Sequence, residues 1–586
     1  MSILSSSEAV TTAELAHAPF EPLLDTVRMV VVTDGAEPVW TLSEITGGLR
    51  ILEVAAPGAA VEIRLSVPLG DATGYWHPKI GWNRTVVADW EGRSEVSLVD
   101  GLAAGCLYDY AGATLLTFAA ADPVPEVALR YGVSEENDTH VVHLRLPASA
   151  TPHRFLFVPR SPSVASALRV LRGWYETAMP APMPVPEAAR LPFYCTWYAF
   201  NQQIDAVQVE RQAELAAEMG FGALILDDGW QRLGRGRGYA GVGDWTPDTD
   251  KFPDFAGHVA RVRRDGLRYV AWVAPLLLGP RADCYETWAP FATAAARVPG
   301  AYVLDPRHPG VRAHVVAVCL RLVRDYGLDG LKADFLNEAM VYAGDGRGDV
   351  GVAVETLLTE LRTALLAERP DVLLELRQPY VGPGMAAFGN MLRSDDCPAD
   401  STANRVRTID TSLLAIGSAV HSDPLLWDTD APVEAAARQL IGALHSVPQI
   451  SVRLDALIPE QAAAVRFWLG QWRRLRPQLL DGTVEPGRPD SLYTLVRSAA
   501  EDVQVLSVHE ERAVPLLPAA HRETVLINAT AADRVVVDVR DEGAQMEIDV
   551  RGPDGRIVER TRMLLVPGLH SVPLPSMGLA LLTKTP

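Results

Sequence analysis

A lysine and an aspartate stand two residues apart in the segment Gly-Leu-Asp-Gly-Leu-Lys-Ala-Asp-Phe at positions 327–335. The segment has the pattern of a short buried strand. Side chains two apart on a strand share one face, so Lys332 and Asp334 should point the same way. An ammonium group favours the ionised form of a neighbouring carboxyl group, and such a carboxylate suits a nucleophile better than a proton donor. An isolated pair of this kind is more often a salt bridge at a strand end, so its interpretation depends on the rest of the chain.

More carboxylates, together with arginines and tryptophans, fall at the ends of other predicted strands. Carboxylates and arginines can bind the hydroxyl groups of a sugar, and tryptophan faces can cover its C–H surfaces. Two carboxylates on opposite sides of a glycosidic bond are what glycoside hydrolysis requires. In chain order the set is Trp197, Asp227, Asp228, Trp230, Gln231, Trp272, Lys332, Asp334, Glu375, Arg377, Arg393, Asp395, Asp396, His421 and Asp423.

Asp334 is the predicted nucleophile of this set, and Asp395 is the predicted acid/base. Strand alternation places Asp395 on the face of Arg393. Asp396 is the second choice for the acid/base, its alternative role being a turn or helix cap before Pro398.

The adjacent acids Asp227 and Asp228 end an apolar strand. Burying both is costly unless they bind something, so both are predicted to reach the pocket. Trp197, Trp230 and Trp272 fit a pocket wall or the core equally well. His421 could equally be a packed core histidine.

Eight short apolar segments alternate with helix-length amphipathic segments over residues 192–478. This alternation predicts an α/β domain with a (β/α)8 (TIM) barrel. A doubly wound sheet is the main alternative, but no glycine-rich phosphate loop follows the first strand. The predicted strands are 193–198, 223–227, 269–274, 330–334, 372–377, 390–395, 417–421 and 449–453, and helices are expected at 206–219, 256–264, 311–326 and 354–368.

The flanking segments alternate apolar and polar residues in short runs between turns, which predicts β-sandwiches. We expect an N-terminal β-sandwich with a connecting helix at 1–178, a proline-rich linker at 179–191, and a C-terminal antiparallel β-sandwich at 479–586, with a first strand at 491–496. The aromatic stretch 74–78 is predicted to be a packed turn, or alternatively a loop whose Trp76 reaches over the pocket of a neighbouring domain.

The composition narrows the possible partners. The chain of 586 residues carries a net charge of -20, which argues against nucleic acid or an anionic membrane as the main partner. Its five cysteines are widely spaced and form no metal-binding pattern, so neither a disulfide framework nor a zinc site is expected. The first ten residues lack the features of a secretory signal, and no apolar run could span a bilayer, so a cytoplasmic location is predicted.

Several motifs, in this order, resemble glycoside hydrolase family 36, the α-galactosidases and raffinose-synthase relatives. They are Leu-Asp-Asp-Gly-Trp-Gln at 226–231, Asp-Thr-Asp-Lys-Phe-Pro at 248–253, Val-Leu-Asp-Pro-Arg-His-Pro at 303–309, Asp-Gly-Leu-Lys-Ala-Asp-Phe at 329–335 and Arg-Ser-Asp-Asp-Cys-Pro at 393–398. The resemblance implies a retaining mechanism without a cofactor. It also implies that Asp334 is the nucleophile, Asp395 the acid/base, and Lys332, Asp227, Asp228, Arg393 and Arg405 sugar-binding residues.

Two departures from the family pattern bear on the preference for galactose. The Cys-x-x-Gly-Gly stretch of larger family members is replaced by Glu-Leu-Arg-Gln-Pro-Tyr at 375–380, and Leu331 stands where the family has a tryptophan. The Lys-Ala-Asp-Phe segment followed by Asn337 and Glu338 also resembles family 31 α-glucosidases, whose His-Trp-Gly-Gly motif is missing.

We therefore predict a retaining α-glycosidase that acts on small oligosaccharides or glycosides, with α-galactosidase as the first choice. The alternatives are a raffinose-synthase-like transglycosylase, an α-glucosidase of the family 31 kind and a non-catalytic carbohydrate-binding protein. A homodimer or homotetramer is possible for any of these.

Overall fold

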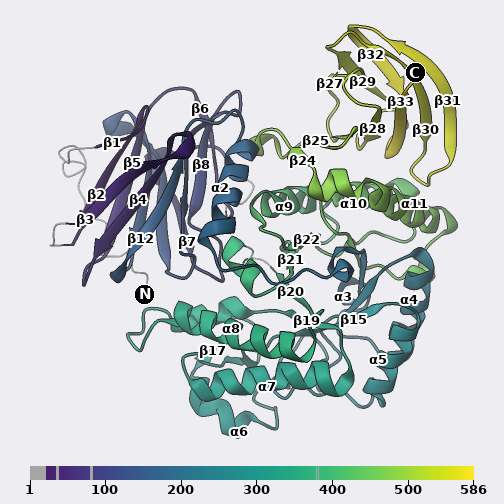
Figure 1. Cartoon of the computed structure of the whole chain (residues 1–586). Helices are drawn as coiled ribbons and strands as arrows, with labels where there is room; N and C mark the ends of the chain where they lie inside the picture. Colours follow the sequence, from purple (N-terminus) through teal and green to yellow (C-terminus); the bar gives the residue numbers. More distant parts are fainter. Residues whose placement is uncertain (1–20, 35–37, 80–83, 378, 380–381, 586) are drawn as a thin grey trace. The chain divides into compact units, whose positions relative to one another are not determined.

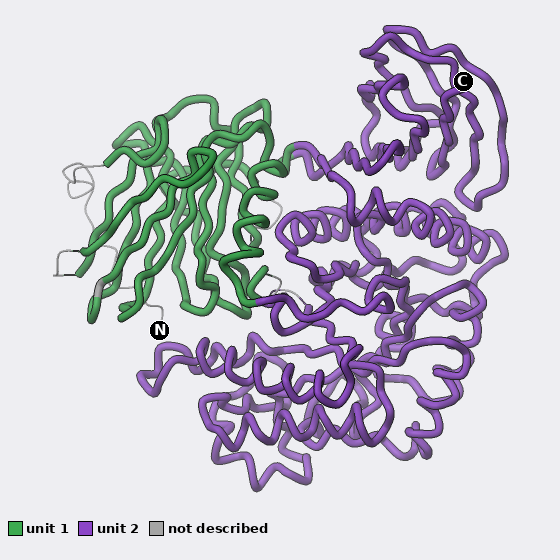
Figure 2. Tube along the Cα trace, in the orientation of Figure 1, with its two compact units in different colours: residues 1–180, 382–384, 488–490 green, residues 181–381, 385–487, 491–586 purple. Residues whose placement is uncertain are grey.

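The computed structural model describes residues 21–34, 38–79, 84–377, 379 and 382–585. These residues form two compact units, shown in Figure 2. The first unit comprises residues 1–180, 382–384 and 488–490, and the second comprises the remainder. The domain boundaries given above remain predictions, and the N-terminal decapeptide used for the predicted location lies outside the described residues.

The first unit is a sandwich of two six-stranded sheets with one apolar core, to which Met29, Leu65, Phe118 and Phe155 contribute. Helix α2 (Val164–Ala178) follows the last strand and begins at Ser163, whose hydroxyl accepts a hydrogen bond from the Ser166 amide. In sheet order the strands are β1 (Glu21–Leu24), β2 (Val27–Thr33), β5 (Val61–Pro68), β11 (Thr139–Leu146), β10 (Val127–Ser134) and β7 (Gly92–Val96), then β3 (Val39–Ile45), β4 (Leu49–Ala56), β12 (Ser149–Val158), β9 (Thr114–Ala120), β8 (Ala104–Asp109) and β6 (Ala72–Trp76).

The aromatic stretch at 74–78 is largely a strand, which corrects the prediction of a turn or loop. Gly74, Tyr75 and Trp76 belong to β6 and pair with β8, and both aromatic side chains are buried. Gly74 allows the pairing because a Cβ atom there would lie 2.2 Å from the Tyr108 hydroxyl oxygen. The role of Trp76 in a carbohydrate pocket stays a prediction.

The second unit contains an eight-stranded, wholly parallel sheet with helices around it, as Figure 1 shows. Parallel bridges from His421 to Val447 and from Leu425 to Ile450 close it between its last two strands. The predicted barrel is therefore confirmed, and all eight predicted strand segments supply a strand: β13 (Phe193–Cys195), β14 (Ala223–Leu226), β15 (Arg268–Val273), β19 (Gly330–Ala333), β20 (Leu373–Arg377), β21 (Met391–Arg393), β22 (Ala419–His421) and β23 (Gln449–Ile450).

The helices of the barrel also follow the amphipathic pattern. Helix α4 has the bounds predicted from the sequence, with Asp205 as its N-cap and Gly220, at φ 87°, as its C-cap. The principal helices are α4 (Ala206–Met219), α5 (Phe255–Arg264), α7 (Pro309–Tyr326), α8 (Val350–Glu368), α9 (Ser401–Leu414), α10 (Val433–Gly442) and α11 (Pro459–Arg476).

Smaller elements lie in the connections of the barrel. They are α3 (Trp197–Phe200), α6 (Tyr285–Trp288), η7 (Leu336–Tyr342), and a three-stranded sheet of β16 (Leu277–Leu278), β18 (Tyr302–Val303) and β17 (Ala294–Ala295). Among the described residues, no helix combines the length and the apolar character needed to cross a membrane.

The C-terminal segment of the second unit forms a seven-stranded and a three-stranded sheet around a common apolar core. The predicted sandwich is present, but the pairs β26–β28 and β27–β29 are parallel. The strand predicted at 491–496 begins later, at Leu495, because Leu492 and Tyr493 have positive φ angles. In sheet order the strands are β24 (Thr483–Glu485), β25 (Leu495–Ala500), β26 (Val503–Val508), β28 (Glu523–Asn528), β33 (Gly578–Lys584), β30 (Ala544–Arg551) and β31 (Ile557–Leu565), then β27 (Val514–Leu516), β29 (Arg534–Val539) and β32 (Gly568–Pro573).

Asp329, directly before β19, ties the amino-terminal end of the barrel together. Its buried carboxylate accepts hydrogen bonds or ion pairs from Arg263 (3.1 Å), Arg268 (2.8 Å), Arg369 (3.0 Å) and the Tyr269 amide (2.9 Å). These partners come from α5, β15 and the end of α8, so one carboxylate links three elements.

Asp329→Ala should therefore lower the free energy of unfolding by about 3 kcal/mol, because it leaves these cations without their shared acid. Urea denaturation followed by tryptophan fluorescence would measure the change. Asp325→Ala, at an exposed acid on the same chain segment, is the matched control and should change stability by less than about 0.5 kcal/mol. Equal stability of the two variants would contradict this role of Asp329 in linking the three elements.

Candidate active site

The carboxyl ends of the barrel strands bring most of the predicted chemical residues together. Asp227 and Asp228 follow β14, Asp334 follows β19, and the loop after β21 carries Asp395 and Asp396. In a parallel barrel these ends open at the same face, where catalysis takes place in barrel enzymes. We call this group of strand ends the barrel mouth.

Asp334 is held by three donors at the mouth. Its Oδ1 accepts from the Phe335 amide at 2.7 Å and pairs with Arg377 Nε at 2.8 Å. Its Oδ2 accepts from the indole Nε1 of Trp272 at 2.9 Å. The residue is 7% exposed, so the orientation of its carboxylate is fixed by protein groups rather than by bulk water.

The backbone turns sharply immediately after Asp334. Phe335 adopts φ 55° and ψ 26°, a left-handed conformation that costs a residue with a Cβ atom about 1 kcal/mol. This turn directs the Phe335 amide onto the Asp334 carboxylate. Local strain of this kind is concentrated at functional sites.

The cation beside Asp334 is not Lys332, which corrects the expectation drawn from strand alternation. Lys332 Nζ instead donates to Asp227 Oδ2 at 2.6 Å, and both side chains are buried. Burial lowers the pKa of Lys332, but the Asp227 carboxylate outweighs it, so the pKa lies above its ordinary value. Arg377 is the cation that contacts Asp334.

Asp228 is bound by two glutamine amides, from Gln202 at 2.8 Å and Gln231 at 2.7 Å. Both amides are fixed as donors, because Gln202 Oε1 accepts from the Arg237 amide and Gln231 Oε1 accepts from the Gly229 amide. Burial raises the pKa of Asp228 to about 6. The two adjacent acids are thus both satisfied by side chains of the protein.

Arg393 lies behind the mouth rather than on its surface. It is 2% exposed, and it pairs with Asp396 at 2.8 Å and with the fully buried Asp423. Asp423 also accepts from the Tyr198 hydroxyl (2.9 Å) and the Cys397 amide (2.8 Å). Arg393 and Asp423 therefore position the loop that carries Asp395 and Asp396.

The prediction that Asp395 shares a strand face with Arg393 was wrong. Strand β21 ends at Arg393, so alternation does not extend to Asp395, and Arg393 binds Asp396 instead. Burial raises the pKa of Asp396, but Arg393, Arg377 and Lys332 outweigh it and hold the pKa well below its ordinary value. A carboxylate held ionised in this way is a poor proton donor.

Two of the three predicted tryptophans, Trp230 and Trp272, lie in the core beneath the barrel mouth. Trp230 is fully buried, stacks on Phe255, and donates its indole hydrogen to the Trp272 carbonyl at 2.9 Å. Trp272 is also buried and holds Asp334. Both are therefore core supports rather than pocket walls. Trp197 is partly exposed, and the Arg237 guanidinium lies 5.3 Å from its ring centre.

Two further predicted residues lie outside this cluster. Arg405 on α9 contacts His509 Nδ1 at 2.8 Å and the Leu492 carbonyl at 3.1 Å, so it is occupied by the C-terminal segment. Burial lowers the pKa of Arg405 to about 10. His421 is a core histidine, bound to the Ala189 carbonyl at 2.8 Å, and burial lowers its pKa to about 4.

Arg377 was recognised at the end of its predicted strand but received no role. The structure places it between Asp334, Asp395 and Asp396. The sequence signal was the presence of this arginine in the segment that replaces the Cys-x-x-Gly-Gly stretch. The later part of that segment, including Gln378 and Tyr380, lies outside the described residues.

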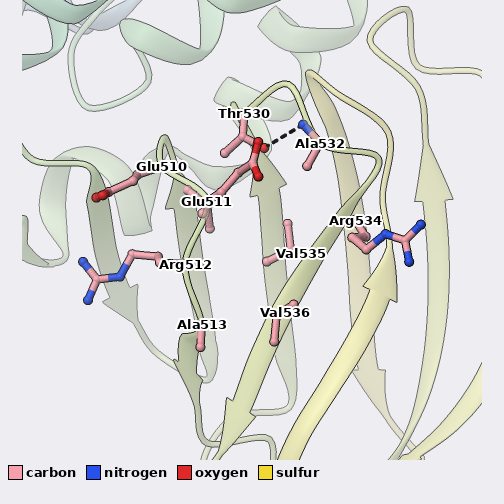
Figure 3. Close-up of a pocket in the computed structure, with 10 residues that line it drawn as sticks. Glu510, Glu511, Arg512, Ala513, Thr530, Ala532, Arg534, Val535 and Val536 are labelled. Carbon is pink, nitrogen blue, oxygen red and sulfur yellow. Dashed lines mark hydrogen bonds between the residues drawn. The ribbon is translucent and has the colours of Figure 1, made fainter.

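Elsewhere in the described chain, neither a candidate metal site nor a cavity offers as many groups suited to catalysis as the barrel mouth does. No three His, Cys, Asp or Glu residues there are grouped so that they could hold a metal ion. A cavity of about 460 Å³ lies in the C-terminal segment, lined by Glu510, Glu511 and Arg512 on one side and Arg534, Val535 and Val536 on the other (Figure 3). None of the described residues lining it is aromatic, and its glutamates and Arg512 are exposed.

Comparison with known proteins gives consistent matches. Residues 189–366 match the Melibiase family model. Alpha-galactosidase C of Emericella nidulans is 27% identical over 205 residues, which cover 32% of this chain and 26% of that protein. An alpha-galactosidase of Escherichia coli is 30% identical over 161 residues, covering 26% and 22%. The chain thus spans about a quarter of the length of the curated relatives it matches.

Solved structures extend the similarity to the whole fold. The family 36 α-galactosidase AgaA of Geobacillus stearothermophilus, in complex with 1-deoxygalactonojirimycin, superposes with a TM-score of 0.62 at 13% identity, over 97% of this chain and 86% of that one. The α-galactosidase TtGalA of Thermus thermophilus superposes with a TM-score of 0.55 at 18% identity, over 79% and 98%. The fold is that of barrel glycoside hydrolases with flanking β domains. Residues 189–366 are thus similar to the Melibiase family, and the chain shares its fold with family 36 α-galactosidases.

Removing one member of the buried Lys332–Asp227 pair should destabilise the protein strongly. Lys332→Met should cost about 3–5 kcal/mol, because Asp227 is left as a buried charge without its cation. The double variant with Asp227→Asn should recover part of the loss. Urea denaturation of the two single variants and the double variant forms a double-mutant cycle. If the losses in unfolding free energy of the single variants simply added up in the double variant, direct coupling of Lys332 and Asp227 would be contradicted.

The raised pKa of Asp228 predicts a pH-dependent stability. Its pKa is about 6 in the folded protein against 3.8 as the ordinary value, so the folded state binds the proton more tightly. This favourable contribution is complete only below pH 3.8 and is lost as the pH rises through 6, by at most about 3 kcal/mol.

Asp228→Asn provides the reference, because asparagine does not titrate and any cost of its amide is independent of pH. The stability of the wild type relative to this variant should fall between pH 4 and pH 7. Thermal unfolding midpoints measured across this range would show it, and a constant difference would contradict the shifted pKa.

Proposed function

We propose that the protein is an α-galactosidase that releases terminal α-linked galactose from small glycosides with retention of configuration. Asp334 is the nucleophile and Asp395 is the acid/base. The observation that carries the proposal is the Asp334 carboxylate at the barrel mouth, fixed by three donors and joined to Asp395 through Arg377. The choice of galactose rests on the named relatives and on the family model, whose matched residues include Asp227, Asp228 and Asp334.

The contacts of Asp334 suit a two-step displacement. Oδ1 accepts two donors whereas Oδ2 accepts one from Trp272, so Oδ2 keeps the freer lone pair for attack on the anomeric carbon. Preorganised donors need no rearrangement as the charge on the carboxylate changes during reaction. Lys332 and Asp227 hold each other in place beside this group.

Asp395 suits the acid/base role better than its neighbour. Its side chain is 46% exposed, so it can reach both a leaving group and water, and Arg377 Nη1 lies 3.4 Å from its Oδ1. Asp396, by contrast, is committed to Arg393 at 2.8 Å and its pKa is lowered. The proton that the leaving group needs therefore comes from Asp395.

Replacing Asp334 should abolish the reaction. Asp334→Gly should lower kcat on an aryl α-galactoside by at least about 10⁴-fold, because the covalent intermediate cannot form. Azide with an activated substrate should restore part of the rate and give the inverted glycosyl azide. A fully active Asp334→Gly variant would rule out this nucleophile.

The acid/base assignment has its own matched pair of variants. Asp395→Asn should slow substrates with poor leaving groups by about 10²–10⁴-fold and activated aryl substrates much less. Asp396→Asn should affect both kinds of substrate alike, because its carboxylate positions the loop. If instead Asp396→Asn slowed only the substrates with poor leaving groups, Asp396 would be the acid/base and Asp395 the residue that positions the loop.

Aryl α-galactoside and aryl α-glucoside assayed side by side test the sugar. Cleavage of the galactoside alone is the expected result. Cleavage of the glucoside alone would overturn the sugar while keeping the mechanism.

A further inference from the structure

Arg377 is the last residue of β20 and its guanidinium group contacts three carboxylates. Nε lies 2.8 Å from Asp334 Oδ1, Nη1 lies 3.4 Å from Asp395 Oδ1, and Nη2 lies 3.6 Å from Asp396 Oδ2. Its side chain is 16% exposed and its guanidinium carbon lies 5.8 Å from the centre of the Phe335 ring. The planar group thus presents a different nitrogen to each acid, which a lysine could not do.

The other cations at the barrel mouth are committed to different partners. Lys332 is paired with Asp227, and Arg393 is paired with Asp396 and Asp423. Arg407 reaches the same loop and donates to the main-chain carbonyls of Asp395 and Asp396. Within the described part of the chain, Arg377 is the cation that contacts both Asp334 and Asp395.

We propose that Arg377 is a positioning residue that holds the nucleophile and the acid/base through one guanidinium group and stabilises the negative charge on each in turn. This inference rests on the proposed function. It adds a residue that the sequence resemblance did not assign, at a position where the resembled family has a different segment. It also explains why one arginine stands among three acids.

The two chemical steps show what the contact provides. In the first step an oxygen of ionised Asp334 bonds to the anomeric carbon, the bond to the leaving oxygen breaks, and the proton of Asp395 passes to that oxygen. The negative charge thereby leaves Asp334 and appears on Asp395. In the second step a water oxygen bonds to the anomeric carbon, the ester bond to Asp334 breaks, and the water proton passes to Asp395.

Arg377 touches both carboxylates, so the charge stays beside the same cation throughout. The summed charge of Asp334, Asp395 and Arg377 is the same before and after each step. An electrostatic partner that is already in place does not have to be recruited from solvent as the charge moves. The contribution should therefore appear in the chemical step rather than in substrate binding.

The test compares Arg377→Met, Arg377→Lys and Arg377→Ala with the wild type on an aryl α-galactoside. Arg377→Met should lower kcat at least 100-fold and change KM less than 5-fold. Arg377→Lys should keep more activity than Arg377→Met, because it retains a cation but cannot contact both acids at once. Arg211→Met, at an exposed arginine of α4, is the control and should retain wild-type kinetics.

Chemical rescue separates positioning from a purely structural role. Guanidinium ion at millimolar concentration should raise kcat of Arg377→Ala at least 10-fold, whereas equal concentrations of urea or sodium chloride should not. The pH profile of kcat should also change in Arg377→Met and return toward that of the wild type in Arg377→Lys. A side chain that merely supports folding would show neither effect.

The failure of this inference differs from the failure of the proposed function. Wild-type protein that cleaves neither aryl α-galactoside nor aryl α-glucoside would contradict the function and this role with it. An active wild type whose Arg377→Met variant keeps kcat within 3-fold would overturn only the role of Arg377. A loss that appeared in KM alone, or the absence of any rescue by guanidinium, would overturn that role in the same way.

Discussion

The barrel mouth depends on the pairing of charged side chains that the fold removes from water. Taking a carboxylate or an ammonium group out of water costs several kcal/mol unless a counter-charge and hydrogen bonds replace the solvent. The protein meets this cost by giving each buried acid a specific partner. Asp227 has Lys332, Asp423 has Arg393, and Asp228 has two glutamine amides.

The same constraint applies to Asp334, the proposed nucleophile, whose hydrogen-bond donors are themselves held by other groups. Trp230 supports the carbonyl of Trp272, and the Trp272 indole in turn holds Asp334. The strained turn at Phe335 adds an amide to the same carboxylate. Packing over-determines the position of Asp334, so the left-handed backbone persists although an ordinary residue avoids it.

The sequence was informative where local patterns decide structure. Short apolar runs identified all eight barrel strands, and the amphipathic segment at 206–219 gave both ends of α4. Local patterns failed where unusual backbone angles intervene, as at Leu492 and Tyr493, and where an aromatic stretch belongs to a strand, as at Trp76. Backbone angles of single residues are set by their tertiary surroundings, which hydrophobic periodicity does not report.

The grouping of these residues at the barrel mouth could be predicted from the sequence, but the partners of each charged side chain could not. Strand order placed the acids at one end of the barrel, yet alternation assigned Lys332 to Asp334 and Asp395 to Arg393. The real partners, Asp227 and Asp396, depend on where each strand ends and on the register between neighbours. Lys332 and Asp227 are 105 residues apart in the chain, so no local rule connects them.

Closure of the barrel by β23 has a consequence for synthesis of the chain on the ribosome. The first strand, β13, pairs on one side with β14 and on the other with β23, whose residues 449 and 450 emerge about 250 residues later. Until then the sheet has two open edges, and Glu375 lacks the amide of Gln449 that binds it in the finished barrel. The N-terminal sandwich carries its own core and can fold during this interval. The nascent barrel, with unpaired edges and an incompletely bonded polar interior, is the species that must be protected from association with other chains.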